Sequence, residues 1–297
     1  MKAKRKNQLE GHKGPLYAVA NFKDHKILSG GSDRRVVEWD LESEEGGVLA
    51  NSAAAIISLL YLEEFNLLLI GQMEGGVHII DLEARKEIKY LKGHEKYIFD
   101  MVYLPQKQEL VFASGDGSFS VWSAKTFERL YHQQLCDVKL RKMELSEDEK
   151  ELLICRGDGI ISRFSTSDYA EVGQIKSKAG FNVARYSTDD KHILAGDKEA
   201  HLHLIDKHSN EILKSLPAHY WPIYDLQFSP SGKYFATASR DKTVKIWDVD
   251  SLKVLERIEG REYGGHSHSV NALFWPEESL LISTGDDSMV KLWQIDA

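Results

Sequence analysis

The chain has 297 residues, of which 42% are hydrophobic and 28% are charged, and its formal net charge is −8. This composition is typical of a globular protein and excludes a disordered one. The negative charge argues against a surface built to bind nucleic acid, and no stretch approaches the roughly 18 apolar residues of a membrane-spanning helix. Two cysteines, Cys136 and Cys155, are too few for a disulfide framework or a zinc site, so we expect a reduced, cytoplasmic protein.

The N-terminal stretch MKAKRKNQLEGH is basic, but no apolar run follows it, which argues against a secretory signal peptide. Lys2, Lys4, Arg5 and Lys6 are compatible with a localisation signal or with an arm that binds nucleic acid or anionic lipid. We favour an exposed edge strand, in which lysines prevent pairing with other chains.

An aspartate followed six residues later by a tryptophan is the first sign of an internal repeat. Asp33 and Trp39 have this spacing, and Asp241 and Trp247 share it within SRDKTVKIWDVD. Equivalent large apolar residues stand at positions 39, 80, 122, 164, 205, 247 and 293, with steps of 41, 42, 42, 41, 42 and 46. A Gly-His or Ala-His pair precedes four of the tryptophans by 27 or 28 residues. This regularity indicates seven copies of one unit.

Two short apolar runs separated by a turn lie between the histidine and the tryptophan of a unit. In the sixth unit they are IYDLQF (223–228) and KYFATAS (233–239), and in the third unit IFDMVY (98–103) and ELVFASG (109–115). Runs of this composition predict antiparallel strands, and no convincing amphipathic helix occurs. Four strands per unit, repeated seven times, predict an all-β fold: one seven-bladed β-propeller over residues 1–297.

Units 1, 3, 6 and 7 contain both the Gly-His or Ala-His pair and the tryptophan. In these residues the chain resembles the WD-repeat family, and the resemblance covers essentially the whole chain. Units 2, 4 and 5 have lost the histidine and the tryptophan. The resemblance implies a buried hydrogen-bond chain of His, Ser or Thr, Asp and Trp that stiffens each blade, because a buried carboxylate requires donors. In unit 3, Phe112 occupies the hydroxyl position. The implied structural residues are His12, Ser29, Asp33 and Trp39; His94, Asp116 and Trp122; His219, Thr237, Asp241 and Trp247; and His266, Ser283, Asp287 and Trp293.

Other motifs do not indicate catalysis. The histidine pairs His201 with His203 and His266 with His268 lack a third candidate ligand for a metal. The stretches SGG, EGG and GDG have no strand–loop–helix context and are interpreted as turns instead of phosphate loops. We therefore predict no catalytic residue, no cofactor and no metal.

The two chain ends predict how the ring closes. The seventh unit ends at Ala297, directly after the Trp293 strand, so it is one strand short. Conversely, a segment precedes His12 that resembles residues 87–94 at the end of the second blade. We expect residues 3–10 to supply the outer strand of the last blade, which would leave no open edge between blades 7 and 1.

The resemblance also implies a top face formed by the loops that carry the histidine and the aspartate. Three positions per unit map to it: the two residues that flank the first apolar residue of the inner strand, and the residue before the turn aspartate. Aromatic residues and arginine dominate binding at protein interfaces, and Tyr97, Phe99 and Arg141 should form the strongest cluster. With Trp221 from the loop entering blade 6, the predicted partner-binding residues are Tyr17, Met73, Tyr97, Phe99, Arg141, Lys198, Trp221, Tyr224 and Arg240.

Acidic turns mark the opposite face, at residues 63–64, 147–149, 189–190 and 277–278. We interpret them as solvated turns, although the asymmetry of charge favours an acidic peptide on the top face.

The predicted function is a non-enzymatic interaction module, or scaffold, that is monomeric alone and binds a partner protein or peptide on its top face. One alternative is an enzyme with its site in the central channel, but the inner strands offer few inward acids or histidines. The other is binding of nucleic acid or anionic lipid through the basic N-terminus.

Overall fold

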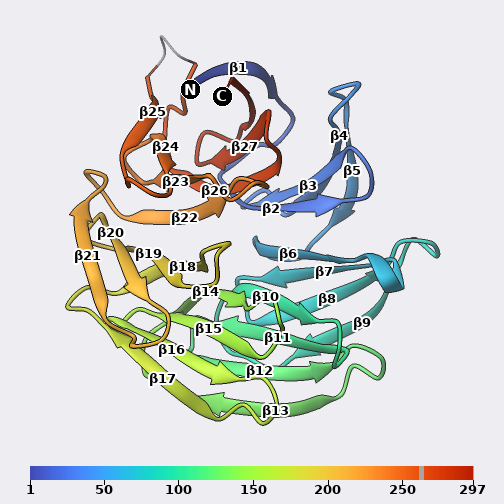
Figure 1. Cartoon of the computed structure of the whole chain (residues 1–297). Helices are drawn as coiled ribbons and strands as arrows, with labels where there is room; N and C mark the ends of the chain where they lie inside the picture. Colours follow the sequence, from blue (N-terminus) through green and yellow to red (C-terminus); the bar gives the residue numbers. More distant parts are fainter. Residues whose placement is uncertain (261–263, 297) are drawn as a thin grey trace.

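The computed structural model describes residues 1–260 and 264–296, which form 28 β-strands and one 3-10 helix. The strands make seven four-stranded antiparallel sheets arranged in a ring (Figure 1). Neighbouring blades meet through their first strands, which line the central channel. The predicted all-β, seven-bladed propeller is confirmed. No helix in the described part of the chain is long and apolar enough to cross a membrane.

The first three blades use the chain in order from the inner to the outer strand. Blade 1 consists of β2 (Leu16–Phe22), β3 (Lys26–Gly31), β4 (Arg35–Asp40) and β5 (Gly46–Asn51). Blade 2 consists of β6 (Ile56–Leu62), β7 (Leu67–Gln72), β8 (Gly76–Asp81) and β9 (Lys86–Lys92), with the helix η1 (Glu63–Phe65) after β6. Blade 3 consists of β10 (Ile98–Leu104), β11 (Glu109–Ser114), β12 (Ser118–Ser123) and β13 (Arg129–Gln134).

The remaining blades continue this order around the ring. Blade 4 contains β14 (Leu140–Leu145), β15 (Glu151–Arg156), β16 (Ile160–Ser165) and β17 (Glu171–Lys176). Blade 5 contains β18 (Phe181–Tyr186), β19 (His192–Asp197), β20 (His201–Asp206) and β21 (Ile212–Pro217). Blade 6 contains β22 (Ile223–Phe228), β23 (Tyr234–Ser239), β24 (Val244–Asp248) and β25 (Val254–Ile258). Blade 7 contains β26 (Val270–Glu277), β27 (Leu280–Gly285), β28 (Val290–Asp296) and β1 (Lys2–Leu9).

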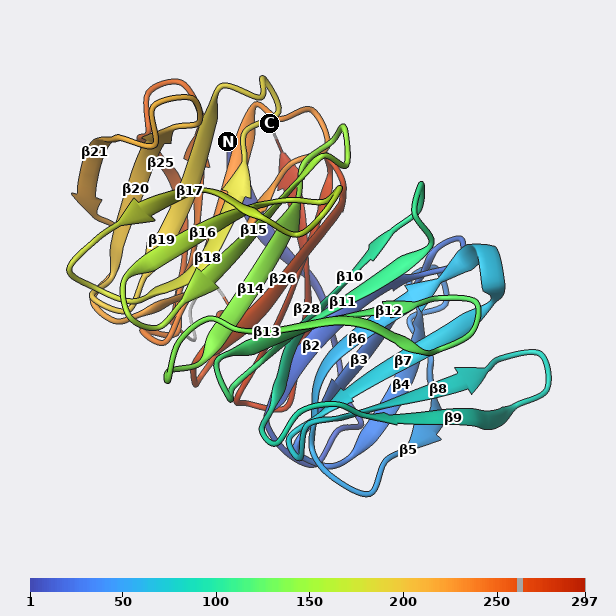
Figure 2. The same ribbon diagram turned by 90° about the horizontal axis from the view of Figure 1, so that it is seen from below.

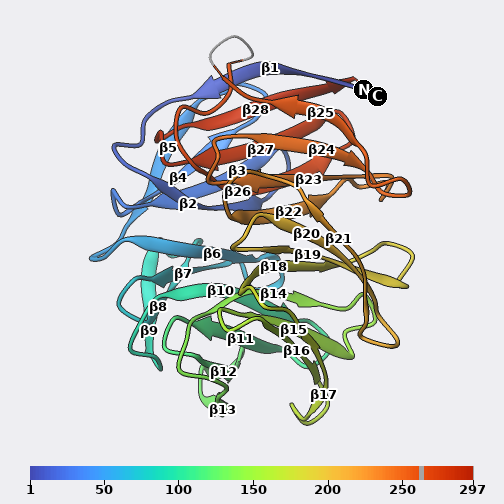
Figure 3. The ribbon, with the colours of Figure 1, turned by 90° about the vertical axis from the view of Figure 1, so that its left-hand side faces the viewer.

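Strand β1 closes the ring. It pairs antiparallel with β28 from Lys2 opposite Asp296 to Leu9 opposite Val290. The two termini therefore lie side by side, as Figure 3 shows. The prediction that residues 3–10 complete the last blade is confirmed, and the lysines of β1 lie on an outer strand, as expected.

Seven apolar clusters fill the spaces between neighbouring blades. The cluster between blades 7 and 1 joins Trp39 to Leu280 and Ile282, and equivalent clusters occupy the other six spaces. Alternate residues of each strand enter the cluster on either side of the blade because side chains of a strand alternate between its faces. Each blade is thus buried on both faces, and the ring depends on all seven interfaces.

The hairpin between the second and third strands of every blade contains one residue with a left-handed backbone. In blade 3 it is Gly117, at φ 88°. A Cβ atom there would lie 2.0 Å from the carbonyl oxygen of Cys136, so this position requires glycine. The equivalent residues in the other blades are Arg34, Gly75, Gly159, Ala200, Lys242 and Ser288.

The hydrogen-bond chain implied for blade 1 is present. Trp39 Nε1 donates to Ser29 Oγ at 2.7 Å, and His12 Nε2 lies 2.7 Å from the same hydroxyl. His12 Nδ1 lies 2.9 Å from Asp33 Oδ2, so the imidazole donates there and accepts from the serine. Blades 6 and 7 contain the same chain, through Thr237 and Ser283.

Blade 3 keeps the chain despite Phe112. Its hydroxyl comes from Ser120 on β12, the residue directly opposite Phe112 in the sheet register. Trp122 Nε1 donates to Ser120 Oγ at 2.7 Å, and His94 Nε2 lies 2.7 Å from it. The expectation of a missing hydroxyl in this unit is therefore wrong, since the neighbouring strand supplies it.

Blades 4 and 5 replace the chain with other polar pairs. In blade 5, His203 on β20 binds Asp197 through Nε2 at 3.0 Å and Ser215 through Nδ1 at 2.7 Å. In blade 4, Arg156 donates to Asp158 at 2.6 Å. His203, one of the paired histidines that the sequence analysis set aside as metal ligands, thus has structural partners in its own blade.

Candidate interaction site at the mouth of the central channel

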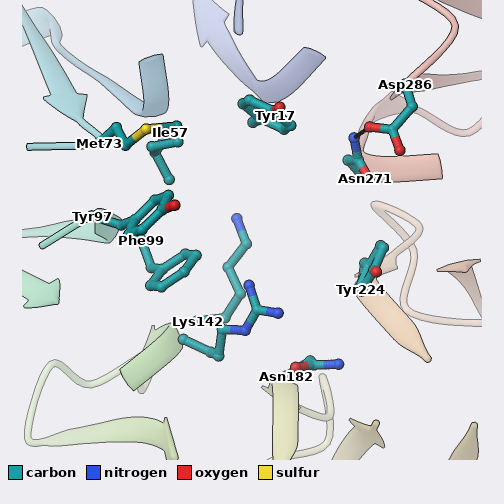
Figure 4. Close-up of a pocket in the computed structure, with 11 residues that line it drawn as sticks. Tyr17, Ile57, Met73, Tyr97, Phe99, Lys142, Asn182, Tyr224, Asn271 and Asp286 are labelled. Atoms are coloured by element: carbon teal, nitrogen blue, oxygen red, sulfur yellow. Dashed lines mark hydrogen bonds between the residues drawn. The ribbon is translucent and has the colours of Figure 1, made fainter. Parts of the chain in front are cut away.

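A β-bulge interrupts the inner strand of every blade near its start. In blade 1, Leu16 and Ala18 oppose the consecutive residues Gly31 and Gly30, so Tyr17 has no partner in the ladder. A bulge re-aims the extra side chain away from the regular pleat. All seven bulge residues line one pocket of about 380 Å³ at the mouth of the channel (Figure 4). They are Tyr17, Ile57, Phe99, Arg141, Asn182, Tyr224 and Asn271.

The loops around this pocket are held by one backbone hydrogen bond per blade. The amide before each turn donates to the carbonyl that precedes the inner strand, as from Ser32 to Pro15 at 2.8 Å and from Arg240 to Pro222 at 3.1 Å. Equivalent bonds occur in the other five blades. In blades 3 and 6 a serine hydroxyl adds a second bond to the loop. These bonds restrain the loops of the pocket wall before any ligand binds, which lowers the entropic cost of binding.

Aromatic rings and one guanidinium form the wall contributed by blades 3 and 4. The Tyr97 and Phe99 rings stack with their centroids 5.3 Å apart and their planes within 8°. The guanidinium carbon of Arg141 lies 4.6 Å from the Phe99 centroid. Sequence reasoning grouped these three residues, and the structure brings them together.

Arg141 has no counter-ion among the described residues. Its Nε atom is buried without a hydrogen-bond partner there. Burial lowers the pKa of Arg141, because desolvation disfavours the charged form. Burial also lowers the pKa of nearby Lys139, to which the charges of Arg141 and Lys198 contribute further. This wall therefore carries excess positive charge, and its charged groups are partly shielded from water.

The opposite wall, from blade 7, is polar and acidic. Asn271 Nδ2 donates to Asp286 Oδ1 and to the Leu16 carbonyl, both at 2.7 Å. Burial raises the pKa of Tyr17, and the charge of Asp286 raises it further. In Figure 4, Asp286 and Asn271 lie across the pocket from Tyr97 and Phe99, and Lys142 projects between them. The pocket thus has a cationic-aromatic side and an acidic side.

Six of the nine predicted partner-binding residues line the pocket, and three do not. Lys198, Trp221 and Arg240 lie outside it. The Trp221 side chain is 54% exposed, and the Arg240 guanidinium lies 4.9 Å from its ring centroid. Sequence reasoning missed Lys142, which enters the pocket beside the blade 4 bulge, and it did not select Asp286. The bulge residues point into the pocket because they have no partner in the strand pairing. The amino-acid composition of a strand does not show which of its residues lacks a partner.

A buried ionic cluster on the inner strands corrects the expectation of few inward acids. Arg185 on β18 pairs with Glu144 on β14, and its Nη2 lies 3.9 Å from Asp225 on β22. Asp225 Oδ2 accepts the Leu273 amide of the next blade at 2.9 Å, and Asp100 Oδ2 accepts the blade 4 amide of Met143 at 2.8 Å. These acids tie neighbouring inner strands together. No group of three or more His, Cys, Asp or Glu side chains within 1–260 and 264–296 could hold a metal ion.

The acidic turns of the opposite face have structural partners. Asp148 Oδ1 accepts the Ser146 hydroxyl at 2.7 Å and the Lys150 amide at 3.1 Å, and Asp189 caps its own turn in the same way. Glu64 accepts the Tyr103 hydroxyl at 2.7 Å. Burial and this hydrogen bond raise the pKa of Tyr103 to about 12. These contacts agree with turns that serve the fold.

Comparison with known proteins identifies the repeats. The family model for the WD domain, G-beta repeat, matches residues 3–40, 85–123, 210–248 and 259–294, which are units 1, 3, 6 and 7. WD repeat-containing protein 55 of Homo sapiens is 25% identical over 92% of this chain and 74% of its own length. The serine-threonine kinase receptor-associated protein of Homo sapiens is 23% identical over 86% of this chain and 70% of its own.

Two further matches extend the comparison. The striatin homolog of Dictyostelium discoideum is 25% identical over 69% of this chain, but the matched region spans only 27% of that longer protein. The crystal structure of the WD40 beta propeller domain of Doa1 superposes with a TM-score of 0.87 at 18% identity, covering 99% of this chain and 97% of that one. The latter likeness shows the shared fold alone.

Proposed function

The chain belongs to the WD domain, G-beta repeat family, and on that premise we propose that it is a non-enzymatic interaction scaffold whose channel-mouth pocket receives a segment of a partner protein. Propellers of this family are typically protein-interaction scaffolds and are generally non-catalytic. One relative is named for association with a serine-threonine kinase receptor. The observation that carries the proposal is the Arg141 guanidinium, partly desolvated beside the pocket and without a counter-ion among the described residues.

The partner segment that fits this pocket is acidic and apolar. A carboxylate accepts two parallel hydrogen bonds from a guanidinium, and such charge-assisted bonds are among the strongest in proteins. A carboxylate of the partner would replace the water contacts that the Arg141 guanidinium loses on burial. The stacked rings of Tyr97 and Phe99 offer a flat apolar surface beside that charge, and aromatic-arginine clusters of this kind are typical hot spots.

The proposal includes a monomeric, cytoplasmic protein. Two free cysteines, Cys136 and the buried Cys155, support a reducing compartment. The basic N-terminal residues are used in β1 as the outer strand of blade 7, where Lys4 pairs with Asp296 at 3.5 Å. This structural use favours protein binding over a nucleic-acid arm.

Affinity capture with the full chain tests the proposal. Three baits are compared by quantitative mass spectrometry: the wild type, the double variant Tyr97→Ala/Arg141→Ala, and the opposite-face variant Glu147→Ala/Glu149→Ala. We expect the first double variant to lose the partners that the wild type retains, and the second to keep them. Normal capture by Tyr97→Ala/Arg141→Ala together with loss by Glu147→Ala/Glu149→Ala would show that the binding face is the opposite one.

A further inference from the structure

The channel-mouth pocket holds two opposite charges that the chain leaves unpaired. Of the residues that the structure describes, three charged ones line it: Arg141, Lys142 and Asp286. Lys142 Nζ lies 3.9 Å from Asp100 Oδ1, so this cation has an acid beside it. Neither Arg141 nor Asp286 forms an ion pair with any described residue. The unpaired charges of the lining residues are therefore one cation and one anion.

The two unpaired charges come from opposite sides of the ring. Arg141 is the bulge residue of β14 in blade 4, and Asp286 lies in the turn between β27 and β28 in blade 7. Two blades three steps apart lie as far from each other as a ring of seven allows. Figures 1 and 2 show this for blades 2 and 5, whose outer strands β9 and β21 lie at opposite ends of the molecule. The pocket thus separates Arg141 from Asp286, which explains why they do not pair with each other.

The Asp286 carboxylate is held in place but keeps free bonding capacity. Its backbone amide donates to the Ser269 carbonyl at 2.9 Å, and its Oδ1 accepts from Asn271 Nδ2 at 2.7 Å. The same Asn271 nitrogen also donates to the Leu16 carbonyl of blade 1, so both of its hydrogens are used. Asp286 Oδ2 accepts no side-chain hydrogen bond from the described residues. A basic side chain of a ligand can therefore bind there, because a carboxylate accepts about four hydrogen bonds.

Apolar and aromatic side chains connect the two charged sides of the pocket. Ile57 and Met73 of blade 2 and Tyr17 of blade 1 line it between blade 3 and blade 7 (Figure 4). Met73 is 37% exposed, so part of this surface is open to a ligand. A chain segment that crosses the pocket from one charge to the other can bury apolar side chains on the way.

We propose that the pocket selects a dipolar segment of the partner protein, in which an acidic residue pairs with Arg141 and a lysine or arginine pairs with Asp286. This inference rests on the proposed function, because it concerns the partner of the same pocket. Apolar residues lie between the two charges of the segment and contact Ile57, Met73 and Tyr17. Both ion pairs are charge-assisted hydrogen bonds, which are roughly twice as strong as neutral ones.

The separated charges argue against a uniformly acidic segment and against an uncharged one. A second carboxylate on the blade 7 side would lie near Asp286, and like charges in contact oppose binding. An uncharged segment would displace water from Arg141 and Asp286 without replacing its hydrogen bonds, which is costly for charged groups. A segment with both signs, held apart by apolar residues, satisfies both walls.

Selection from a library of random twelve-residue peptides displayed on phage tests this inference, with the immobilised full chain as bait. Phage that bind the variant Tyr97→Ala/Arg141→Ala are removed first, so that the remaining peptides bind at the channel mouth. These peptides are synthesised, and their affinities are measured by fluorescence anisotropy.

Two variants that each remove one negative charge are compared. Asp286→Asn keeps an oxygen that can accept from Asn271. Glu199→Gln is the matched control, because Glu199 is an exposed acid in the turn between β19 and β20, outside the pocket. Both variants should melt like the wild type.

We expect peptides that carry an acidic residue and a lysine or arginine with apolar residues between them. Their affinity should fall by about fivefold or more with Asp286→Asn and by less than about twofold with Glu199→Gln. Replacement of the basic residue of the peptide by glutamine should weaken binding to the wild type by the same factor and should change binding to Asp286→Asn very little. Such coupling would show a direct contact between the two charges, because the effects of independent changes add.

The outcomes separate this inference from the proposed function. Peptides that depend on Arg141 but lack a basic residue, or that bind Asp286→Asn as tightly as the wild type, would overturn the dipolar segment and leave partner binding at the channel mouth intact. Equal losses with Asp286→Asn and Glu199→Gln would also overturn it, because net charge alone would then explain the effect. A selection that yields no peptide dependent on Arg141 would refute both proposals.

Discussion

Replacing Asp241 by alanine should destabilise the whole propeller. The Asp241 carboxylate is 4% exposed and accepts four hydrogen bonds. The donors are His219 Nδ1 at 3.0 Å, the Tyr220 amide at 3.1 Å, the Thr243 amide at 3.0 Å and the Thr243 hydroxyl at 2.6 Å. Alanine removes the acceptor and leaves these donors behind.

The size of the effect follows from how many donors water can reach. Tyr220 is exposed, so its amide can bond to solvent, and the Thr243 hydroxyl oxygen can accept the His219 Nδ1 proton at 3.1 Å. The amide and the hydroxyl proton of Thr243 then lose their acceptor, at about 1–3 kcal/mol each, so we expect a loss of about 2–6 kcal/mol. Because the blade is buried on both faces, the loss should appear in the global transition.

Urea unfolding followed by intrinsic fluorescence and by far-ultraviolet circular dichroism measures this loss. The matched control is Glu74→Ala in blade 2, at the position that aligns with the turn aspartate. Glu74 is exposed and makes no side-chain hydrogen bond or ion pair with the described residues, so its change should stay within about 0.5 kcal/mol. Equal losses from the two substitutions would refute the structural role of the network.

Three further predictions concern the ring. Removal of residues 1–9 takes away β1, and the melting temperature of the single cooperative transition should fall by about 10 °C or more; a change of only a degree or two would contradict closure by β1. Ser120→Ala should cost about 1–3 kcal/mol in urea because the Trp122 N–H loses its acceptor and His94 Nε2 loses its donor, and a loss similar to that of Ser165→Ala, at the end of β16, would argue against this. Stability should also fall as the pH drops below 6.5, the ordinary histidine value. Burial lowers the pKa of His12, His219 and His266 in the fold, so the unfolded chain takes up protons first; a midpoint in urea that stays constant from pH 7 to pH 5 would contradict this.

The sequence predicts the ring because its markers are local. The spacing of six between Asp241 and Trp247 and the step of about 42 between units survive even where the residues change. Closure by β1 follows from one missing strand and one extra segment. Neither inference requires knowledge of which strands face each other.

The parts that sequence reasoning missed depend on contacts between strands. Ser120 replaces the hydroxyl expected at Phe112 because the two residues oppose each other in the register, so either strand can place an oxygen there. Arg185 and Glu144 belong to neighbouring blades, 41 residues apart, and only the packing of their inner strands brings them together. The residue types of one strand do not show which residues of another strand they will contact.

The channel-mouth pocket, too, is predictable from the sequence only in part. The residue types of Tyr97, Phe99 and Arg141 indicate an interface from sequence alone. The bulges that turn one residue per blade toward the channel mouth are visible only in the ladder pairing. That Arg141 has no counter-ion among the described residues is visible only in the folded structure.

Site-specific photocrosslinking tests the central claim, that partners bind at the channel mouth. p-Benzoylphenylalanine replaces Tyr97 in one version of the full chain and Glu147, on the opposite face, in another. Both are irradiated with the partners that the wild type captures. We predict crosslinks from position 97 to an acidic, apolar segment of the partner, suppressed by Arg141→Ala, and none from position 147. Crosslinks from position 147 alone, or crosslinks from position 97 that persist unchanged with Arg141→Ala, would contradict the account.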